Sequence, residues 1–391
     1  MMMQTRSPRY SAFWLFLCCL LTTAPLLARA ETMIPRPPQV EARSYLLLDA
    51  KSGQILVEHD ANKELPPASL TKMMTAYLVE KEIQSGNINE QDMVPISVKA
   101  WRMGGSRMFV KEGTRVPLID LLKGVIVQSG NDASVALAEY VAGSEDAFAD
   151  LMNNQARQLG MDHTHFVNAT GWPAENHYTT AHDLAWLARA IIRDYPEHYD
   201  IYAEKEFTYN GITQPNRNLL LWRDESVDGL KTGHTEEAGY CLVSSAKQDG
   251  MRLIAVVMGT DSEAARARES QKLLSYGFRF YETYEGYGAE DVLDTPEVWL
   301  GEADQVRLGL DEALVLTIPK GSRDQLKAEM SIQPELRAPI QKGQQYGTLT
   351  VRLGDEQLVE RPLVALETVE QAGFFSRIWD HVVLFFKGLF S

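Results

Sequence analysis

Cysteine is scarce in this 391-residue chain, which contains only Cys18, Cys19 and Cys241. The first two lie in a segment with a basic start, an apolar run at Phe13–Leu21 and the small-residue site Ala28-Arg29-Ala30. This arrangement is typical of a secretory signal peptide over residues 1–30, so we expect an exported protein that keeps Cys241 alone. A single cysteine excludes an intramolecular disulfide, and the apolar surroundings of Cys241 predict a small core residue.

Basic residues are also few, because 38 lysines and arginines stand against 53 acidic residues and give a formal net charge of -15. Without residues 1–30 the charge becomes -18. Such an acidic chain is a poor partner for nucleic acid. Metal-ligand patterns are lacking as well, since His163 and His165 have no accompanying ligands at suitable spacing. We therefore predict no nucleic-acid partner, no metal site and no cofactor.

The apolar patterns that are present predict an α+β fold. Two short apolar runs, 45–49 and 54–58, flank a turn that contains Gly53 and predict a β-hairpin. Strand patterns return at 241–246 and 253–258, after a series of helical patterns. Strands on both sides of such a series favour an antiparallel sheet with helices on its faces. The expected helices cover residues 69–81, 118–127, 132–142, 145–159, 181–193 and 264–280.

From about residue 285 the sequence changes to short apolar segments separated by Gly, Pro and Asp. This texture predicts a small β-rich domain over 285–366, after a catalytic domain over 31–284. The β-rich domain lacks a nucleophile–base pattern, so we expect a spacer or docking module.

The end of the chain, residues 367–391, predicts an amphipathic membrane anchor, with a helical pattern from Gly373 to Ser391. Its apolar residues recur at intervals of three and four, and charged residues interrupt them too often for a bilayer span. We expect this helix to lie in a membrane interface as an anchor. Packing against the second domain or against a dimer partner is the alternative.

Three short motifs carry the chemistry. Together they supply a nucleophilic hydroxyl, two amines, a second hydroxyl and a carboxamide, which acyl transfer through a serine ester requires. Each motif alone has an ordinary structural explanation, such as a cap or a turn, but their joint occurrence favours catalysis. The motifs are Ser69-Leu70-Thr71-Lys72, Ser129-Gly130-Asn131 and Lys231-Thr232-Gly233.

The first motif brings a nucleophile together with a base. Two prolines precede Ser69 and a helix-compatible segment follows it, so we predict Ser69 at the first turn of a helix. A spacing of three residues then places the Lys72 amine on the same face as the Ser69 hydroxyl. Burial of the helix would lower the pKa of Lys72 until the amine can accept the hydroxyl proton.

The second motif supplies a proton relay. Ser129 is predicted in a loop between two packed helices, where its hydroxyl can pass a proton between Lys72 and the leaving amine. Asn131 offers its amide to the substrate backbone and to Lys72.

The third motif forms a wall of the cleft. Lys231 and Gly233 would share one face of a strand, and the missing side chain of Gly233 would let this wall approach a bound peptide closely. Lys231 would strengthen the electrostatic field around both serines, while Thr232 and Thr235 could hold a carboxylate. We expect the N–H groups of Ser69 and His234 to form the oxyanion hole.

From about Ser44 to Glu282 the chain resembles the D-alanyl-D-alanine carboxypeptidases of the low-molecular-mass penicillin-binding protein family, peptidase S11 type. The resemblance rests on Ser129-Gly130-Asn131-Asp132-Ala133 and on residues 228–235. It implies a penicilloyl-serine-transferase (β-lactamase-like) fold. It further implies an enzyme that removes the terminal D-alanine from peptidoglycan stem peptides, that is acylated by β-lactam antibiotics, and that works on the periplasmic side of the inner membrane.

The same resemblance implies roles outside the three motifs. Arg217 would lie near the cleft, and Arg266 would engage the substrate carboxylate. For Arg266 a solvated charge on a helix is an equal alternative, because Arg268 lies two residues further on. Residues 104–109 resemble the family's loop that affects deacylation.

Other functions stay open at this point. A β-lactamase is disfavoured, because the second motif lacks the middle aspartate of the Ser-Asp-Asn form and no glutamate is evidently placed to activate water. A DD-endopeptidase would use the same machinery. A non-catalytic penicillin-binding sensor would need a signalling segment across the membrane, which we do not find.

Overall fold

The computed structural model describes residues 34–374 and 378–383. The predicted signal peptide lies outside this part, as does much of the predicted C-terminal helix.

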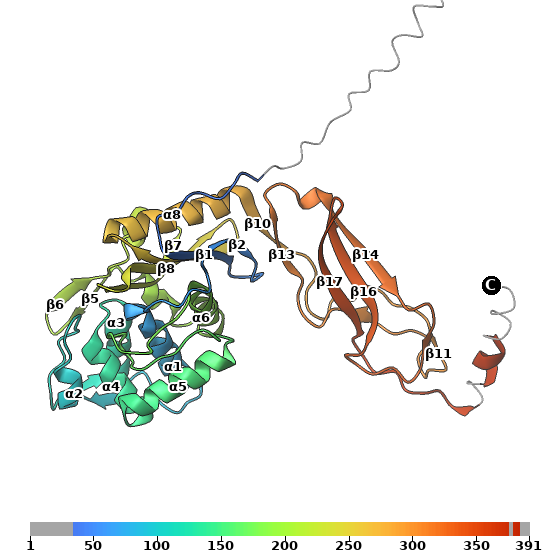
Figure 1. The fold of residues 1–391 in the computed structure, drawn as a ribbon. Coiled ribbons are helices and arrows are strands. Elements are labelled where there is room, and N and C mark those ends of the chain that lie inside the picture. Colours follow the sequence, from blue (N-terminus) through green and yellow to red (C-terminus); the bar gives the residue numbers. More distant parts are fainter. Residues whose placement is uncertain (1–33, 375–377, 384–391) are drawn as a thin grey trace, which may run out of the picture. The chain divides into compact units, whose positions relative to one another are not determined.

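The centre of the N-terminal domain is a five-stranded antiparallel sheet of order β2-β1-β9-β8-β7 (Figure 1). Its inner strands are continuous apolar runs because both faces of the sheet are covered. Leu46 and Leu48 belong to the core shared with the helices, whereas Leu47 faces Gly277 of helix α8. The strands are β1 (Ser44–Asp49), β2 (Ile55–His59), β7 (Val227–Thr235), β8 (Gly239–Gln248) and β9 (Met251–Thr260).

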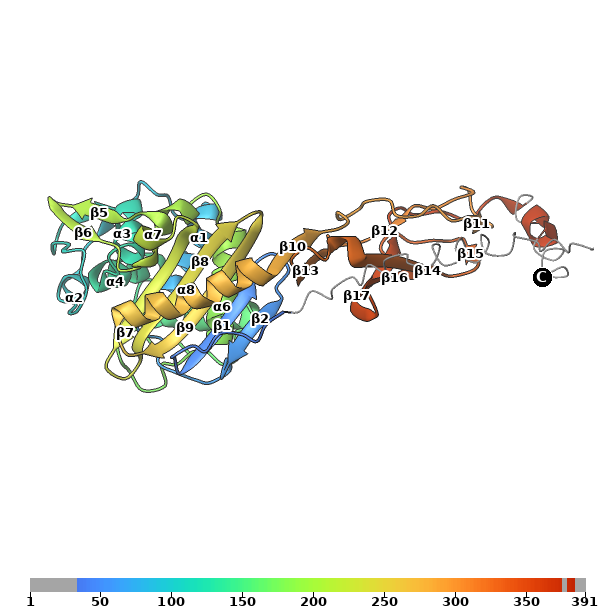
Figure 2. The same cartoon turned by 90° about the horizontal axis from the view of Figure 1, so that it is seen from above.

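Helices cover the two faces of this sheet unequally. The helix α8 crosses one face, where it packs on β8 and β9, while α6 and the remaining helices lie on the other side (Figure 2). Serine or threonine caps begin α5, α6 and α8, whose first-turn N–H groups donate to the cap hydroxyl. The helices are α1 (Lys72–Gln84), α2 (Val98–Trp101), α3 (Leu118–Ile126), α4 (Asn131–Ala142), α5 (Glu145–Gln158), α6 (Ala181–Asp194), α7 (Leu220–Arg223) and α8 (Glu263–Phe280).

This architecture confirms the predicted α+β class with an antiparallel sheet. The model adds two small hairpins that the sequence did not reveal, because strands of three or four residues are too short for an alternating pattern. It also adds short 3-10 turns, one of which holds Ser69. These elements are β3 (Met93–Pro95), β4 (Arg115–Pro117), β5 (Glu206–Tyr209), β6 (Ile212–Pro215), η1 (Ala68–Thr71) and η2 (Tyr199–Ala203).

After α8 the chain forms a β-rich domain. Its largest sheet has the order β12-β17-β16-β14, and β10 pairs with β13 while β11 pairs with β15. Two apolar clusters fill it, one around Ile340 and Val306 and one around Ile318 and Leu349. The elements are β10 (Tyr281–Glu285), β11 (Val298–Trp299), β12 (Leu308–Gly309), β13 (Val315–Pro319), η3 (Arg323–Gln325), β14 (Leu326–Ile332), β15 (Leu336–Arg337), β16 (Gln345–Leu353) and β17 (Glu356–Ala365).

Near the C-terminus, residues 378–383 are helical. Ile378 and Trp379 in this helix are 47% and 70% exposed, and the Asp380 carboxylate accepts a hydrogen bond of 2.8 Å from Leu300 N–H. Among the described residues, none of the helices combines the length and the hydrophobicity that a bilayer span needs.

The fold brings the three motifs to one edge of the sheet. Strand β7, with the third motif, is the edge strand, and the turn η1 packs against it. Ser129 and Gly130 of the second motif lie in the loop between α3 and α4, as predicted, and Asn131 is the first residue of α4. An edge strand leaves backbone N–H and C=O groups free on one side, which suits an extended peptide.

Candidate active site

Ser69 lies in the tight turn η1, immediately before α1. The preceding Ala68 has a φ of 47°, a left-handed conformation that costs an alanine about 1 kcal/mol. Gly171 presses on the same turn, since a Cβ there would lie 1.7 Å from the Ala68 carbonyl oxygen. Ser69 is therefore held in a strained turn against which the segment at Gly171 packs, and only glycine fits at position 171.

Gly233 differs from its predicted role. We expected its missing side chain to let the strand approach a bound peptide, but a Cβ there would point at the η1 turn, 3.1 Å from the Pro67 carbonyl oxygen and 3.2 Å from Leu70 Cγ. The missing side chain of Gly233 thus lets strand β7 approach the turn that contains Ser69. The residue still lines the groove through its backbone.

Lys72 is a buried amine with three hydrogen-bond acceptors around it. Its side chain is 1% exposed, and its Nζ donates to Ser69 Oγ at 3.2 Å, to Asn131 Oδ1 at 2.7 Å and to the Thr170 carbonyl oxygen at 2.5 Å. The predicted pairing of Lys72 with Ser69 and Asn131 is present in the geometry. Three acceptors fix the amine, so that its lone pair becomes available to Ser69 once a proton is lost.

Burial lowers the pKa of Lys72 from 10.5 to about 7, the nearby Arg217 charge adds to the decrease, and the Asp132 carboxylate opposes it. A general base is most effective when its pKa lies near the working pH. Near neutrality a large fraction of Lys72 is therefore uncharged and able to accept the Ser69 proton.

A second serine–lysine pair lies next to the first. Lys231 Nζ donates to Ser129 Oγ at 2.9 Å and to the Thr232 carbonyl oxygen at 3.2 Å. Burial lowers the pKa of Lys231 well below its usual value, and the charges of Lys72 and Arg217 act in the same direction. Ser129 itself has a φ of 61°, so the hydroxyl that meets Lys231 is held on a left-handed backbone.

Asp132 belongs to the stretch 129–133 that resembles the family, but the sequence predicts no role for it. Its carboxylate accepts hydrogen bonds from three consecutive N–H groups, those of Met108 at 2.8 Å, Phe109 at 2.8 Å and Val110 at 3.2 Å. The adjacent Asn131 holds the same loop from the other side. Its N–H donates to the Ser106 carbonyl oxygen and its Nδ2 donates to the Gly104 carbonyl oxygen, both at 2.8 Å. The loop 104–110 is thereby fastened to the start of α4.

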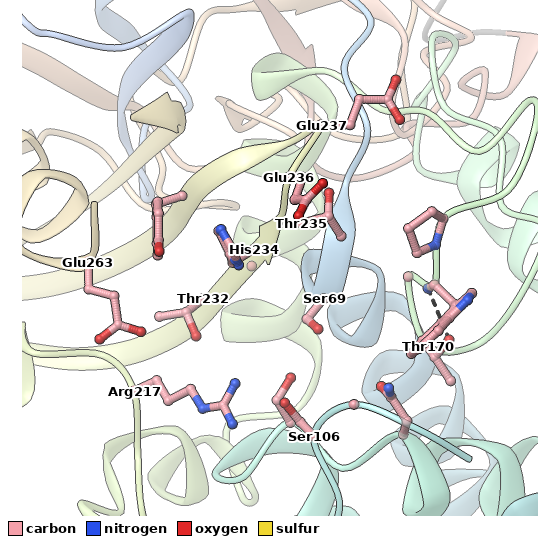
Figure 3. Close-up of a pocket in the computed structure, with 18 of the residues that line it drawn as sticks. Ser69, Ser106, Thr170, Arg217, Thr232, His234, Thr235, Glu236, Glu237 and Glu263 are labelled. Carbon is pink, nitrogen blue, oxygen red and sulfur yellow. Dashed lines mark hydrogen bonds between the residues drawn. The ribbon is translucent and has the colours of Figure 1, made fainter. Parts of the chain in front are cut away.

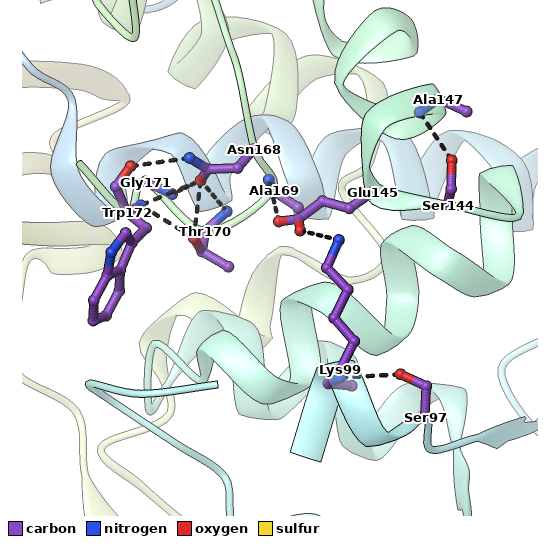
Figure 4. A network of polar contacts seen from close by, with 11 residues as sticks. Ser97, Lys99, Ser144, Glu145, Ala147, Asn168, Ala169, Thr170, Gly171 and Trp172 are labelled. Carbon is purple, nitrogen blue, oxygen red and sulfur yellow. Dashed lines mark hydrogen bonds and ion pairs between the residues drawn. The ribbon is translucent and has the colours of Figure 1, made fainter. Parts of the chain in front are cut away.

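The segment 168–172 provides the Thr170 carbonyl oxygen that accepts from Lys72, and Figure 4 shows the polar contacts that hold this segment. Asn168 Oδ1 accepts hydrogen bonds from the N–H groups of Thr170, Gly171 and Trp172, which folds the segment into a tight turn. Glu145, paired with Lys99 at 2.8 Å, accepts from Ala169 N–H at 3.2 Å. These bonds position the Thr170 carbonyl oxygen that receives Lys72. The sequence offers no signal for this segment, because it contains no catalytic motif.

The groove itself has a volume of about 840 Å³. Figure 3 shows Ser69 near its centre, with Arg217 and Thr170 on opposite sides. The predicted site residues Ser69, Ser129, Asn131, Arg217, Thr232, Gly233, His234, Thr235 and Arg266 all line this groove.

Several of these residues are oriented by neighbours. The His234 ring stacks on Tyr240 with centroids 3.9 Å apart. Thr235 Oγ1 accepts a hydrogen bond from Ala238 N–H at 3.0 Å, which leaves its hydroxyl proton to donate to a substrate. Arg217 is exposed at the groove surface.

The structure excludes one of the two alternatives for Arg266, that of a solvated charge on a helix. It is not a solvated helix charge, because it is 2% exposed and its guanidinium donates at 3.3 Å to the carbonyl oxygens of Gly233 and Arg217. Its charge lies 5.6 Å from the centroid of the Tyr240 ring. Arg266 thus ties β7 to the segment that carries Arg217.

Two further buried residues, Cys241 and His177, were not among the predicted site residues. Cys241 is fully buried, as predicted for a core residue. His177 is a packing residue: its Nε2 lies 2.9 Å from Thr71 Oγ1, its Nδ1 accepts from Val167 N–H, and burial lowers its pKa to about 4.

A hydroxyl beside a desolvated amine, on a β-lactamase-like fold with an edge strand for a peptide, is the arrangement of a serine acyl-transfer enzyme. The chain belongs to the peptidase S11 family, whose model, described as D-alanyl-D-alanine carboxypeptidase, matches residues 31–262. A second model, the C-terminal domain of penicillin-binding protein 5, matches residues 281–371.

Relatives agree along nearly the whole chain. D-alanyl-D-alanine carboxypeptidase DacC of Escherichia coli (strain K12) is 46% identical over 376 residues, which cover 94% of each chain. The crystal structure of penicillin binding protein 5 from Haemophilus influenzae matches with a TM-score of 0.84 and 42% identity, over 86% of this chain and 100% of that one. Penicillin-binding protein D2 from Listeria monocytogenes, solved in an ampicillin-bound form, matches with a TM-score of 0.58 and 29% identity, over 62% of this chain and 100% of that one. The present protein is thus a serine-type D-alanyl-D-alanine carboxypeptidase of the penicillin-binding protein 5 type.

Proposed function

We propose that this carboxypeptidase acts through an acyl ester on Ser69, with Lys72 as the base. The observation that carries the proposal is the buried contact of Lys72 Nζ with Ser69 Oγ at 3.2 Å, at an amine whose pKa is lowered to about 7. The substrate is the D-Ala-D-Ala end of a peptidoglycan stem peptide.

In acylation, neutral Lys72 accepts the proton of the Ser69 hydroxyl while the oxygen attacks the carbonyl carbon of the penultimate D-alanine. The N–H groups of Ser69 and His234 receive the oxyanion that develops. The bond to the terminal D-alanine then breaks, and its amine takes a proton that Ser129 relays from Lys72. Free D-alanine leaves, and the shortened peptide stays as an ester of Ser69.

In deacylation, water replaces the departed D-alanine. Lys72 accepts a proton from the water, whose oxygen attacks the ester carbonyl, and Ser69 regains its proton as the ester bond breaks. Asn131 holds Lys72 in place throughout. Asp132 is a positioning residue in this scheme, because it fastens the loop 104–110 beside Asn131.

The terminal carboxylate of the substrate is bound on the Arg217 side of the groove. Thr232 follows Lys231 on β7 and lines the groove beside Arg217, whereas Thr235 lies further along the same strand (Figure 3). Their hydroxyls can donate to a carboxylate while Arg217 supplies a positive charge. Arg266 supports this end from behind through its bonds to Gly233 and Arg217.

β-Lactams acylate Ser69 by the same route, because their strained amide presents a carbonyl carbon in the position of the scissile peptide. The ampicillin-bound form of the related penicillin-binding protein D2 supports this proposal. The leaving amine remains attached to such an inhibitor, so the acyl-enzyme keeps the groove filled.

We also propose that the protein is exported and lies at the periplasmic face of the inner membrane, where the stem peptides are. The exposed apolar residues Ile378, Trp379 and Val382 support attachment of the C-terminal helix to the membrane surface. The acidic composition supports the absence of a nucleic-acid partner.

The test is release of free D-alanine from diacetyl-Lys-D-Ala-D-Ala by the full chain and by its Ser69→Ala variant. We expect release by the parent protein and none by the variant, which should also fail to bind a fluorescent penicillin covalently. Release that survives in Ser69→Ala, with the same circular dichroism spectrum and melting temperature, would contradict the assignment of the nucleophile.

A further inference from the structure

Arg217, which the proposed function uses to bind the substrate carboxylate, lies in a segment outside the helices and strands. This segment, residues 216–219, connects β6 with α7. The Arg217 side chain is exposed, whereas Asn216 and Asn218 on either side of it are only 6% and 1% exposed. A buried carboxamide is costly unless its donor and its acceptor both have partners. The partners of the two asparagines therefore show what holds the backbone of Arg217.

Asn218 links this segment to the strand of the third motif. Its Nδ2 donates to the carbonyl oxygen of Gly229 at 3.1 Å, and its Oδ1 accepts from Leu220 N–H at 3.1 Å. Gly229 lies on β7, shortly before Lys231. The bond from Leu220 forms a local turn, which aspartate or serine can also make. The bond to Gly229 spans 11 residues and requires a donor with the reach of the asparagine amide.

Asn216 fastens the segment on its other side. Its N–H donates to the Lys205 carbonyl oxygen at 2.7 Å and its Nδ2 donates to the Glu204 carbonyl oxygen at 3.1 Å. Its Oδ1 accepts from Asn218 N–H at 3.0 Å. The Glu204 carboxylate pairs with Lys123 of α3 at 2.6 Å. The segment is thus attached both to β7 and to the helix that precedes the second motif.

The bond between Asn218 and Gly229 matters for catalysis because of where its two ends lie. In the proposed function the substrate carboxylate contacts Thr232 on β7 and Arg217 on the segment. These contacts act together only while the segment keeps a fixed distance from the strand. Arg266 bridges the same two parts with bonds of 3.3 Å. The Asn218 carboxamide is a second, shorter bridge between them.

We propose that Asn218 is a positioning residue for the recognition of the terminal carboxylate. Its carboxamide holds Arg217 at the distance from β7 at which the guanidinium and the Thr232 hydroxyl contact one carboxylate. Asn218 is buried and is not among the residues that line the groove, so it acts through Arg217. The inference rests on the proposed function, because it takes the carboxylate to lie on the Arg217 side of the groove.

The test uses two substrates of the full chain that give the same acyl-enzyme. Diacetyl-Lys-D-Ala-D-Ala has a carboxylate on its leaving group, whereas diacetyl-Lys-D-Ala methyl ester releases methanol and has none. Both need the same base and the same deacylation step, so the ratio of their kcat/KM values, peptide over ester, isolates the contribution of the carboxylate. Arg217→Ala calibrates the measurement, and we expect it to lower this ratio about 10- to 100-fold.

Two variants remove the bridge while keeping the local turn. In Asn218→Ser the hydroxyl can still accept from Leu220 N–H but lacks the reach to Gly229, and Asn218→Asp keeps the size but lacks the donor. We expect the ratio to fall about two- to tenfold in each, as for the loss of one hydrogen bond. In the Arg217→Ala background, Asn218→Ser should change the ratio less than about twofold, because its effect passes through Arg217.

Asn153→Ser is the matched control. The Asn153 carboxamide on α5 also joins two backbone groups, the N–H and the carbonyl oxygen of Phe166, both at 2.8 Å. Its loss removes comparable hydrogen bonds that do not involve Arg217. The ratio of the two kcat/KM values should therefore stay at the parent value, even where the melting temperature falls.

An unchanged ratio in both Asn218 variants would overturn the inference, because equal losses for peptide and ester mean a merely structural role. Failure of both variants to fold would overturn it as well, since the residue would then serve the fold. So would effects of Asn218→Ser and Arg217→Ala that multiply. An unchanged ratio in Arg217→Ala would instead refute the proposed carboxylate site, and a folded parent protein that releases no D-alanine would refute the proposed function itself.

Discussion

The two serine–lysine pairs of the groove are built in different ways. Ser69 and Lys72 are three residues apart, so the turn and helix that contain them bring hydroxyl and amine together. Ser129 and Lys231 are 102 residues apart and meet only because β7 packs beside the α3–α4 loop. The first pair is a local device, whereas the second depends on the whole domain.

The electrostatics of the pairs differ as well. The Asp132 carboxylate partly offsets the burial that lowers the pKa of Lys72, whereas every influence on Lys231 lowers its pKa. The site therefore brings the pKa of Lys72 close to neutrality. On that ground we assign the role of the base to Lys72. Lys231 is assigned a different role, because it donates a hydrogen bond to Ser129.

We expect the largest effect on the acylation rate from a change in the Ser69–Lys72 pair. Lys72→Arg keeps a positive charge but cannot supply a neutral amine, because arginine does not lose its proton in proteins. Acylation of Ser69 by a fluorescent penicillin should slow about 100- to 10,000-fold, the usual contribution of a general base. A Lys72→Arg protein that is acylated at the parent rate would show that Lys72 acts only through its charge.

We expect the next largest effect on the acylation rate from a change in the Ser129–Lys231 pair. Lys231→Met removes the donor to Ser129 at similar side-chain volume, and acylation should fall about 100-fold. Because Lys231 acts through Ser129, the double variant Lys231→Met/Ser129→Ala should be little worse than the more damaging single variant. Effects that multiply would instead indicate that the two residues act independently.

Asp132→Asn tests the link between the loop and the base. The neutral amide cannot accept three N–H groups equally, so deacylation should slow about tenfold as the loop 104–110 loosens, since a lost charge-assisted hydrogen bond is worth about 1.5–3 kcal/mol. The variant also loses a charge that raises the pKa of Lys72. The rise of the acylation rate with pH should therefore move to lower pH. A shift to higher pH would contradict the electrostatic role of Asp132.

The smallest catalytic effect is expected for Arg266, which supports the groove from behind. Arg266→Gln leaves the carbonyl oxygens of Gly233 and Arg217 with fewer donors, so we expect a loss of about 1–3 kcal/mol in unfolding free energy and a moderate rise in KM. Arg279→Gln on the same helix is the matched control. Arg279 is exposed, and its removal should cost below about 1 kcal/mol. Denaturant unfolding of both proteins checks the ranking.

What the sequence could predict follows the same division between local and long-range structure. The sequence allowed us to predict the Ser69–Lys72 contact, the central antiparallel sheet and the burial of Cys241, because spacing and apolar patterns are local signals. The direction of Gly233 was not, since it depends on which side of β7 meets the nucleophile turn. Arg266 was ambiguous for a similar reason: burial of an arginine is decided by carbonyl groups distant in sequence.

The residues that position Lys72 were the part of the site that was hardest to predict from the sequence. Thr170 contributes a backbone carbonyl oxygen, which any residue type could supply, so its identity carries no signal. Trp172 resembles an ordinary exposed aromatic residue until the groove around it is known. Asp132 directly follows the second motif, and its position at the start of a helix concealed its bonds to a loop over twenty residues away.

The central claim is that Lys72 is the base and is neutral near physiological pH. The most direct test is the pH dependence of the second-order rate constant for acylation of Ser69, measured with a fluorescent penicillin for the parent protein and for Lys72→Arg. Because Lys72 must lose a proton to act, the rate should rise with pH and reach half its maximum at about pH 7 in the parent protein. A rate that is independent of pH between about 5 and 9, or the same rise in Lys72→Arg, would contradict the account.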